Sequence, residues 1–298
     1  MADPTLLYGV GATKAGTSWL YRYLHDHDAC KMPAVKEAHY WDTFDPQKRD
    51  KQIAAYTLRL SELTALQQHA LTENRSWQVR NMDRRIACMR ELLEVLRGDR
   101  DEDLAYVAWL MRGAEGAKLV GDITPNYATL SEERLGEMAA LTPTSKFLFL
   151  LRDPIDRLWS HVRMQARRFR QDGEVYAKKA NNILWRVVNA GAEAHIMERG
   201  DYPAIVSKLR RVVPDGRLMV SFIEELVTPE GLRRLCTFLG IPYQSGDAVR
   251  VHAGEEVPMR ADLQPKVAAY LQDQYDWVAM NVGPLPARWQ DNLQRAMA

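Results

Sequence analysis

The segment between residues 6 and 24 constrains the fold more than any other part of the sequence. A short apolar run, Leu6 to Val10, predicts a strand, and Gly11 and Gly16 then bracket a tight turn. A helix is expected from residues 17–18 onward, because apolar side chains recur on one of its faces. A strand, a glycine turn and a helix N-terminus form an anion-binding cradle, since free backbone N–H groups and the helix dipole converge there.

The position of one lysine separates this turn from the loop of a nucleotide triphosphatase. Gly11 and Gly16, followed by Thr17 and Ser18, reproduce the spacing of a phosphate-binding P-loop. A triphosphatase places its lysine directly after the second glycine, whereas this chain has Thr17 there and carries Lys14 inside the loop. The displaced positive charge predicts a different leaving group.

Two runs of residues carry a family resemblance. Lys14-Ala15-Gly16-Thr17-Ser18-Trp19-Leu20 resembles the 5′-phosphosulfate loop of sulfotransferases, which use 3′-phosphoadenosine 5′-phosphosulfate (PAPS). The run from Leu150 to His161 is similar to the family's 3′-phosphate site, where an arginine offers a planar fork of donors and a serine adds a hydroxyl. The resemblance implies these cofactor-binding residues: Lys14, Ala15, Gly16, Thr17, Ser18, Trp19, Arg152 and Ser160. In the alternative, Arg152 pairs with Asp153 or Asp156 and Ser160 faces solvent.

Residues 35–42, Val-Lys-Glu-Ala-His-Tyr-Trp-Asp, indicate a branch of the family. They resemble the Lys-Glu-x-His-aromatic-aromatic-Asp segment of carbohydrate-type sulfotransferases, in which the glutamate is the proposed base. The resemblance implies that Glu37 takes the acceptor's hydroxyl proton during in-line attack on sulfur. Lys36 would hold Glu37 and influence its pKa, while His39 and Asp42 would orient the acceptor or assist proton transfer. A surface salt bridge for Glu37, and packing or capping roles for His39 and Asp42, are the alternatives.

The resemblance also implies that Lys14 stabilises charge on the bridging oxygen as the sulfuryl group departs, without a metal ion. Residues 121–127, Gly-Asp-Ile-Thr-Pro-Asn-Tyr, are similar to the Thr-Pro-x-Tyr segment that lines the family's acceptor cleft. The candidate acceptor-binding residues are therefore Lys36, His39, Asp42, Thr124 and Tyr127.

Two positions depart from the pattern of glycosaminoglycan sulfotransferases. Those proteins usually carry a lysine just before Thr-Pro, where this chain has Ile123. Many also close the cofactor site with a late Lys-Gly-Arg loop, where this chain offers residues 252–260, with Arg260 as the candidate replacement. Both departures weaken the hypothesis of a sulfated polysaccharide and leave a small hydroxylated molecule, a lipid or a carbohydrate as the acceptor.

Apolar periodicity predicts the remaining elements. Further strands are expected at residues 118–123, 146–151 and 217–222, and the second should be central because it is continuously apolar. Helices are expected within 47–112, at 155–170, at 183–197, from 201–203, at 228–239 and at 263–278. The alternation predicts an α/β fold: a P-loop-like central parallel sheet flanked by helices, in one domain spanning 1–298. Residues 47–112 form a mostly helical insert, and residues 30–44 a loop across the glycine turn.

Net charge, cysteine spacing and the length of the apolar runs argue against several classes of protein. A net charge of +1 argues against general nucleic-acid binding. Cys30, Cys88 and Cys236 show no CxxC spacing and are expected to be buried thiols. The sequence has no apolar run long enough for a membrane span, and its first strand leaves no room for a signal peptide, so a cytoplasmic location is expected. The arginines between Arg163 and Arg170 are expected to form a solvated helix face, with recognition of an acidic acceptor or the pairing of two subunits as alternatives. The oligomeric state stays open.

Two other functions are alternatives to a sulfotransferase that releases 3′-phosphoadenosine 5′-phosphate (PAP). A P-loop nucleotide kinase or triphosphatase is disfavoured by Thr17 and by Arg152, which ends its strand where a metal-binding aspartate would be needed. A non-catalytic phosphoadenosine-binding protein is disfavoured by the segment around Glu37, because a binder needs no base.

Overall fold

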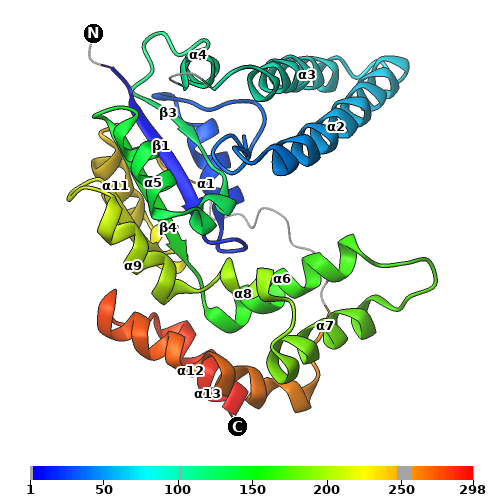
Figure 1. The fold of residues 1–298 in the computed structure, drawn as a ribbon, viewed down its shortest axis with the longest axis vertical. Coiled ribbons are helices and arrows are strands. Elements are labelled where there is room, and N and C mark those ends of the chain that lie inside the picture. Colours follow the sequence, from blue (N-terminus) through cyan, green and yellow to red (C-terminus); the bar gives the residue numbers. More distant parts are fainter. Residues whose placement is uncertain (1–2, 101–102, 247–254, 256, 298) are drawn as a thin grey trace.

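A parallel sheet forms the centre of the protein. The computed structural model describes residues 3–100, 103–246, 255 and 257–297. Five strands are present in these residues, in the spatial order β2-β3-β1-β4-β5 (Figure 1). Their bounds are β1 (Thr5–Gly11), β2 (Cys30–Lys31), β3 (Leu119–Asp122), β4 (Ser145–Leu151) and β5 (Leu218–Phe222). Every neighbouring pair is parallel, which confirms the predicted α/β fold.

β1 is the central strand of the sheet, and β4 pairs with it on one side. Leu7 pairs with Lys146 and Tyr8 with Phe147, and the register shifts between Gly9 and Gly11. Nearly all side chains of both strands are buried, as expected for strands covered on both faces. The parallel direction brings the carboxyl ends of the two strands to one edge of the sheet.

Helices cover the sheet and extend beyond it. α1 (Thr17–His25) buries Trp19, Leu20, Tyr23 and Leu24, as predicted. Asp153 caps α6 (Pro154–Arg168) by accepting the N–H of Asp156 at 2.8 Å, with Pro154 at the first turn. The remaining helices after β3 are η2 (Pro125–Thr129), α5 (Glu132–Ala140), α6 (Pro154–Arg168), α7 (Tyr176–Ala190), α8 (Ala194–Glu198), α9 (Tyr202–Val212), α10 (Ile223–Leu226), α11 (Pro229–Leu239), η3 (Ala261–Leu263), α12 (Gln264–Asn281) and α13 (Ala287–Met297).

Three helices lie between β2 and β3 in the sequence: α2 (Pro46–Thr72), α3 (Ser76–Arg97) and α4 (Leu104–Met111). α2 and α3 form an antiparallel hairpin that projects from the body at the upper right of Figure 1. α2 buries Tyr56, Leu63 and Ala70, seven residues apart, so the helix presents one narrow apolar stripe. None of the helices in the described part of the chain is long and apolar enough to cross a membrane.

Some predicted boundaries are wrong. The single helix expected at 183–197 is two helices, α7 and α8, because Gly191 ends α7 in the left-handed conformation with φ 59°. The short strand β2 and the helices α5, α10 and α13 were not predicted from the sequence. The assignment of the chain to one domain stays a prediction.

Two glycines allow a matched test of the packing. A Cβ at Gly200 would lie 1.9 Å from Cζ of the buried Arg157, whereas a Cβ at Gly136 in α5 meets no described atom within 4 Å. We expect Gly200→Ala to lower the free energy of unfolding by about 1–3 kcal/mol through overpacking. Gly136→Ala should raise it by about 0.5–1 kcal/mol, because alanine favours a helix. Urea denaturation followed by circular dichroism measures both; equal effects would contradict this packing.

Candidate active site

The turn between β1 and α1 has the geometry of an anion-binding site. Gly16 adopts φ 97° and Lys14 φ 70°, so the turn needs left-handed backbone at two positions. α1 starts at Thr17 without a capping side chain from the described residues. The N–H groups of Thr17 and Ser18 can therefore bind a ligand, whereas that of Trp19 donates to the carbonyl oxygen of Gly16 at 2.9 Å. The helix dipole favours a negative ligand. Thr17 is buried and Ser18 half-buried, while Trp19 stacks on Tyr23 with ring centroids 5.7 Å apart.

Arg152 lies at the neighbouring strand end and contacts this turn. Its NH1 group donates to the carbonyl oxygen of Lys14 at 3.2 Å. Tyr202 fixes the backbone of Arg152 by donating its hydroxyl to the carbonyl oxygen at 2.7 Å and accepting the N–H at 3.2 Å. The guanidinium also lies 3.5 Å from Asp156, the pairing that the sequence left open as an alternative. Ser160 lies one turn beyond Asp156 on α6 and is half-buried.

The Lys14 ammonium is surrounded by like charges. Burial lowers its pKa, the charges of Arg152, Arg163 and Lys36 lower it further, and Glu37 opposes the shift. The residues around Lys14 thus form a cationic cluster, defined here as Lys14, Lys36, Arg152 and Arg163. An anionic ligand would relieve the mutual repulsion of these groups.

Arg163 was not identified as a site residue from the sequence. It is half-buried one turn after Ser160 on the same face of α6, and its NH1 group donates to the carbonyl oxygen of Glu255 at 3.2 Å. Arg167, Arg168 and Arg170 are exposed, as the predicted solvated face requires. Helical spacing places both Arg163 and Arg167 on the face of Ser160, so the sequence offers no signal that separates these two arginines.

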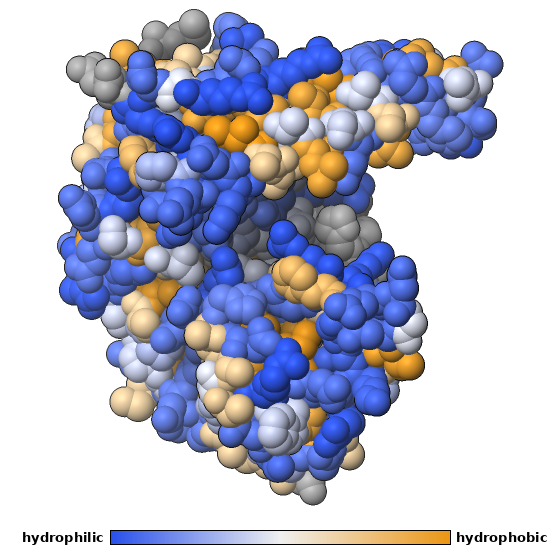
Figure 2. Space-filling view, turned by 45° about the vertical axis from the view of Figure 1, so that its right-hand side comes forward, coloured by the Kyte–Doolittle hydropathy of each residue, from blue (hydrophilic) through white to orange (hydrophobic). Residues whose placement is uncertain are grey.

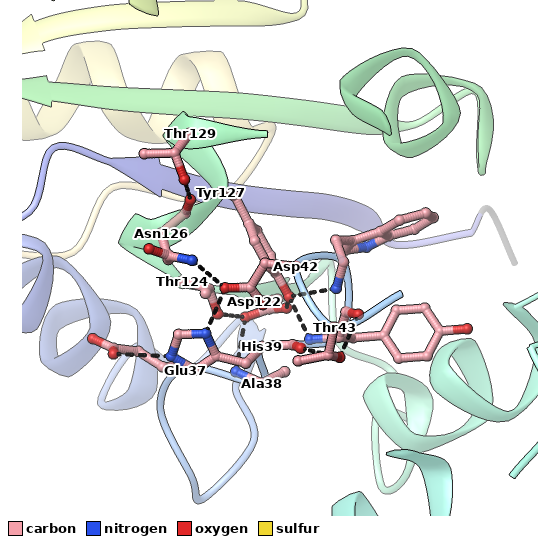
Figure 3. Close-up of polar contacts among 12 residues, drawn as sticks. Glu37, Ala38, His39, Asp42, Thr43, Asp122, Thr124, Asn126, Tyr127 and Thr129 are labelled. Carbon is pink, nitrogen blue, oxygen red and sulfur yellow. Dashed lines mark hydrogen bonds and ion pairs between the residues drawn. The ribbon is translucent and has the colours of Figure 1, made fainter. Parts of the chain in front are cut away.

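Glu37, His39 and Asp42 form a charged chain in the loop after β2 (Figure 3). Nδ1 of His39 lies 2.7 Å from Oδ2 of Asp42, and its Nε2 lies 3.6 Å from Oε2 of Glu37. Lys36 contacts the other oxygen of Glu37 at 2.5 Å. Asn126 donates its side-chain amide to Asp42 and accepts from Nε of Arg199 at 2.9 Å. The structure therefore brings together four of the predicted residues, Lys36, Glu37, His39 and Asp42, and adds Asn126.

The pKa values of Glu37 and His39 shift in opposite directions in this charged chain of side chains. Burial alone would raise the pKa of Glu37, but the hydrogen bond from His39 and the charge of Lys36 outweigh it and lower the pKa to about 2. Burial alone would lower the pKa of His39, but the bonds to Asp42 and Glu37 raise it to about 10. The pairing contributed by His39 is complete below its ordinary pKa of 6.5 and is lost as the pH rises through about 10. That of Glu37 is complete above 4.5 and is lost as the pH falls towards about 2. The charged chain is therefore intact at neutral pH.

The loop backbone is strained at both catalytic candidates. Glu37 has φ 67° and His39 φ 51°, left-handed values that cost a side-chain-bearing residue about 1–3 kcal/mol each. The hydroxyl of Tyr56, from α2, donates to the carbonyl oxygen of Glu37. The inserted helices thus contribute directly to the shape of the site.

The remaining predicted site residues lie elsewhere. Thr124 and Tyr127 are fully buried next to the loop, and both hydroxyls donate to Asp122, at 2.6 and 2.7 Å. Arg260 is exposed and its guanidinium pairs with Asp262 at 2.5 Å. Residues 252–254 and 256 of the late segment lie outside the described residues. Within the described ranges, no group of three or more His, Cys, Asp or Glu side chains could hold a metal ion.

Known proteins share this sequence pattern and this fold. A profile described as the sulfotransferase family matches residues 7–245. A solved sulfotransferase from Alicyclobacillus acidocaldarius is similar with a TM-score of 0.61 and 22% identity, over 97% of this chain and 100% of that chain. The sulfotransferase domain from the curacin biosynthetic pathway is 18% identical, with a TM-score of 0.49 over 99% of this chain and 96% of that one. At 22% identity, the similarity to the Alicyclobacillus acidocaldarius protein is evidence for the fold alone. Comparison with curated proteins gives no match.

Replacing Asp42 tests the charged chain. Asp42→Asn removes the carboxylate 2.7 Å from His39, so we expect the pKa of His39 to fall by roughly 1–3 units. Titration of the histidine ring carbons by NMR measures the shift, with His39→Asn assigning the signal. Asp45→Asn is the control, because Asp45 caps α2 through the N–H of Lys48 and carries the same charge change. An unchanged His39 titration in Asp42→Asn would contradict the pairing.

Proposed function

Because this chain belongs to the sulfotransferase family, we propose that it transfers the sulfuryl group of PAPS to an acceptor hydroxyl and releases PAP. An amine is the less favoured acceptor group. The displacement is in line, with the acceptor oxygen and the leaving phosphate oxygen on opposite sides of sulfur. PAPS supplies an activated sulfuryl group with a phosphate as its leaving group.

The contact between Arg152 and the turn of Lys14 is the main observation that supports this proposal. It joins two phosphate-binding motifs that lie 138 residues apart in the sequence. A nucleotide with phosphates at its 5′ and 3′ positions matches such a two-ended site, one end at the N-terminus of α1 and the other at Arg152 and Ser160. The cationic cluster supports an anionic ligand of this kind.

On the donor side, we assign the 5′-phosphate to the backbone and side chains of residues 15–19. Lys14 would stabilise the negative charge that develops on the bridging oxygen. Arg163 lies one turn beyond Ser160 and adds a second guanidinium to this side of the site. Arg260 keeps its predicted role as a further cofactor-binding residue, in competition with its pairing to Asp262.

On the acceptor side, Glu37 is proposed as the base that takes the hydroxyl proton. A carboxylate with a pKa of about 2 is ionised at neutral pH but is a weak base. Lys36 contributes to that low pKa, so a bound sulfonate that draws Lys36 away would make Glu37 a stronger base. Donor binding and proton abstraction are then linked through Lys36.

His39 serves as a charged partner of Glu37. With a pKa of about 10 its ring is protonated at neutral pH, so it holds Glu37 in place and does not accept the acceptor's proton itself. Lys36, His39 and Asp42 border the acceptor, a small molecule, lipid or carbohydrate. The buried Thr124 and Tyr127 support the acceptor site from within the protein, without an exposed surface for direct contact.

Calorimetric titration with PAP tests the two-ended site without added metal. We expect Lys14→Ala, Arg152→Ala and Arg163→Ala each to weaken PAP binding, by about 10- to 100-fold for Arg152, since each loses a charge-assisted contact. Arg167→Ala is the matched control, because this arginine of α6 is exposed. Binding of ATP that depends on Mg²⁺, with no binding of PAP, would instead support a nucleotide kinase.

Glu37→Gln separates an enzyme from a non-catalytic binder. We expect PAP affinity to stay within about threefold while turnover falls by roughly 10²- to 10⁴-fold, because a base has been removed. PAP release from PAPS is measured with a mixture of alcohols, phenols and sugars as acceptors. Glu62→Gln, on the exposed face of α2, is the control. Equal turnover in the two variants would exclude Glu37 as the base.

A further inference from the structure

A fully buried carboxylate lies next to the loop of residues 37–42 (Figure 3). Asp122 ends β3 and accepts the hydroxyl protons of Thr124 at 2.6 Å, Tyr127 at 2.7 Å and Tyr106 at 2.9 Å. It also accepts the N–H of Ala38, in the loop itself, at 3.4 Å. All four partners can donate to it, and an ionised carboxylate accepts from all four. Burial raises the pKa of Asp122, and these hydrogen bonds lower it.

Tyr127 connects this carboxylate to the backbone of the loop. Its hydroxyl oxygen accepts the N–H of Tyr40 at 3.0 Å and the N–H of Trp41 at 3.4 Å. Its own proton is therefore directed to Asp122. Hydrogen bonds thus lead from two loop amides through a tyrosine hydroxyl to a buried carboxyl group. The two amides belong to the residues that separate His39 from Asp42.

We propose that Asp122 and Tyr127 are positioning residues that hold the loop in the conformation in which His39 bridges Glu37 and Asp42. The inference rests on the proposed function only in naming Glu37 as the base. Neither residue touches the acceptor, since both are buried in the described structure. They act through the backbone of the loop.

The left-handed backbone at Glu37 and His39 explains why the loop needs hydrogen bonds that keep it in this conformation. Left to itself, the loop would relax to the commoner backbone region and separate the three charged groups. Tyr56 and Arg100 hold the loop through the carbonyl oxygens of Glu37 and Tyr40. Among the described residues, Tyr127 is the side chain that holds the two amides between His39 and Asp42.

Two tyrosines of this network give a matched pair of variants. Tyr127→Phe and Tyr106→Phe each remove one buried hydroxyl that donates to the same oxygen of Asp122. Only the first variant also removes the acceptor of the amides of Tyr40 and Trp41. A merely structural role of the network would make the two variants equivalent, whereas positioning makes Tyr127→Phe different.

The titration of His39 is the readout. The charged or titratable groups that face its ring are Glu37, Asp42 and, from α2, Tyr56, with ring centroids 6.4 Å apart. We expect the pKa of His39, measured by NMR, to fall by at least about one unit in Tyr127→Phe, because the carboxylates move away from the ring. It should equal the wild-type value in Tyr106→Phe. The same titration curve in both variants would overturn the proposal.

A measurement on the wild-type protein covers the case in which Tyr127→Phe does not fold. Amide hydrogen exchange should show the N–H groups of Tyr40 and Trp41 protected, because both are hydrogen-bonded in a buried site. Exchange at the rate of an open loop would overturn the proposal. Neither experiment needs turnover or a ligand, so a failure of the proposed sulfuryl transfer would leave their results decisive for the loop.

Discussion

The parallel pairing of β1 with β4 is the constraint on which the site depends. The N–H of Ala12 donates to the carbonyl oxygen of Leu150 at 2.9 Å, which extends the pairing into the glycine turn. This contact places the turn of Lys14 beside Arg152, so that an anion cradle and a guanidinium share one edge of the sheet. A slip of one residue would turn each side chain to the opposite face and separate the two motifs.

The cationic cluster lies next to a second set of charged groups, Glu37, His39 and Asp42. The cationic cluster is held together although its members repel one another, and burial lowers the pKa of Lys14. The carboxylates of Glu37 and Asp42 lie around the imidazolium of His39. Lys36 and Glu37 join the two sets, because they are adjacent in the sequence and in contact. An anion that binds the cations therefore also changes the proton affinity of the carboxylate.

Buried polar side chains hold the loop that carries Glu37, His39 and Asp42. The loop of residues 37–42 has two strained positions, and hydrogen bonds from β3, η2 and α2 determine its shape. The inserted hairpin takes part through Tyr56, so the segment between β2 and β3 both projects from the body and shapes the site. Figure 2 shows apolar side chains along the hairpin beside the hollow that separates it from the lower half of the molecule.

The sequence by itself determined the strand at 6–10, the helix start at Thr17, the strand before Arg152 and the cap at Asp153. Each is a pattern of near neighbours, in which alternation, glycine and capping residues act over a few positions. It did not separate α7 from α8, because glycine can lie inside a helix or end one. Nor did it separate Arg163 from Arg167, or show that Thr124 and Tyr127 are buried. Those assignments depend on contacts between distant segments, such as Glu255 with α6 and the loop of Tyr40 with η2, and only the tertiary structure decided them.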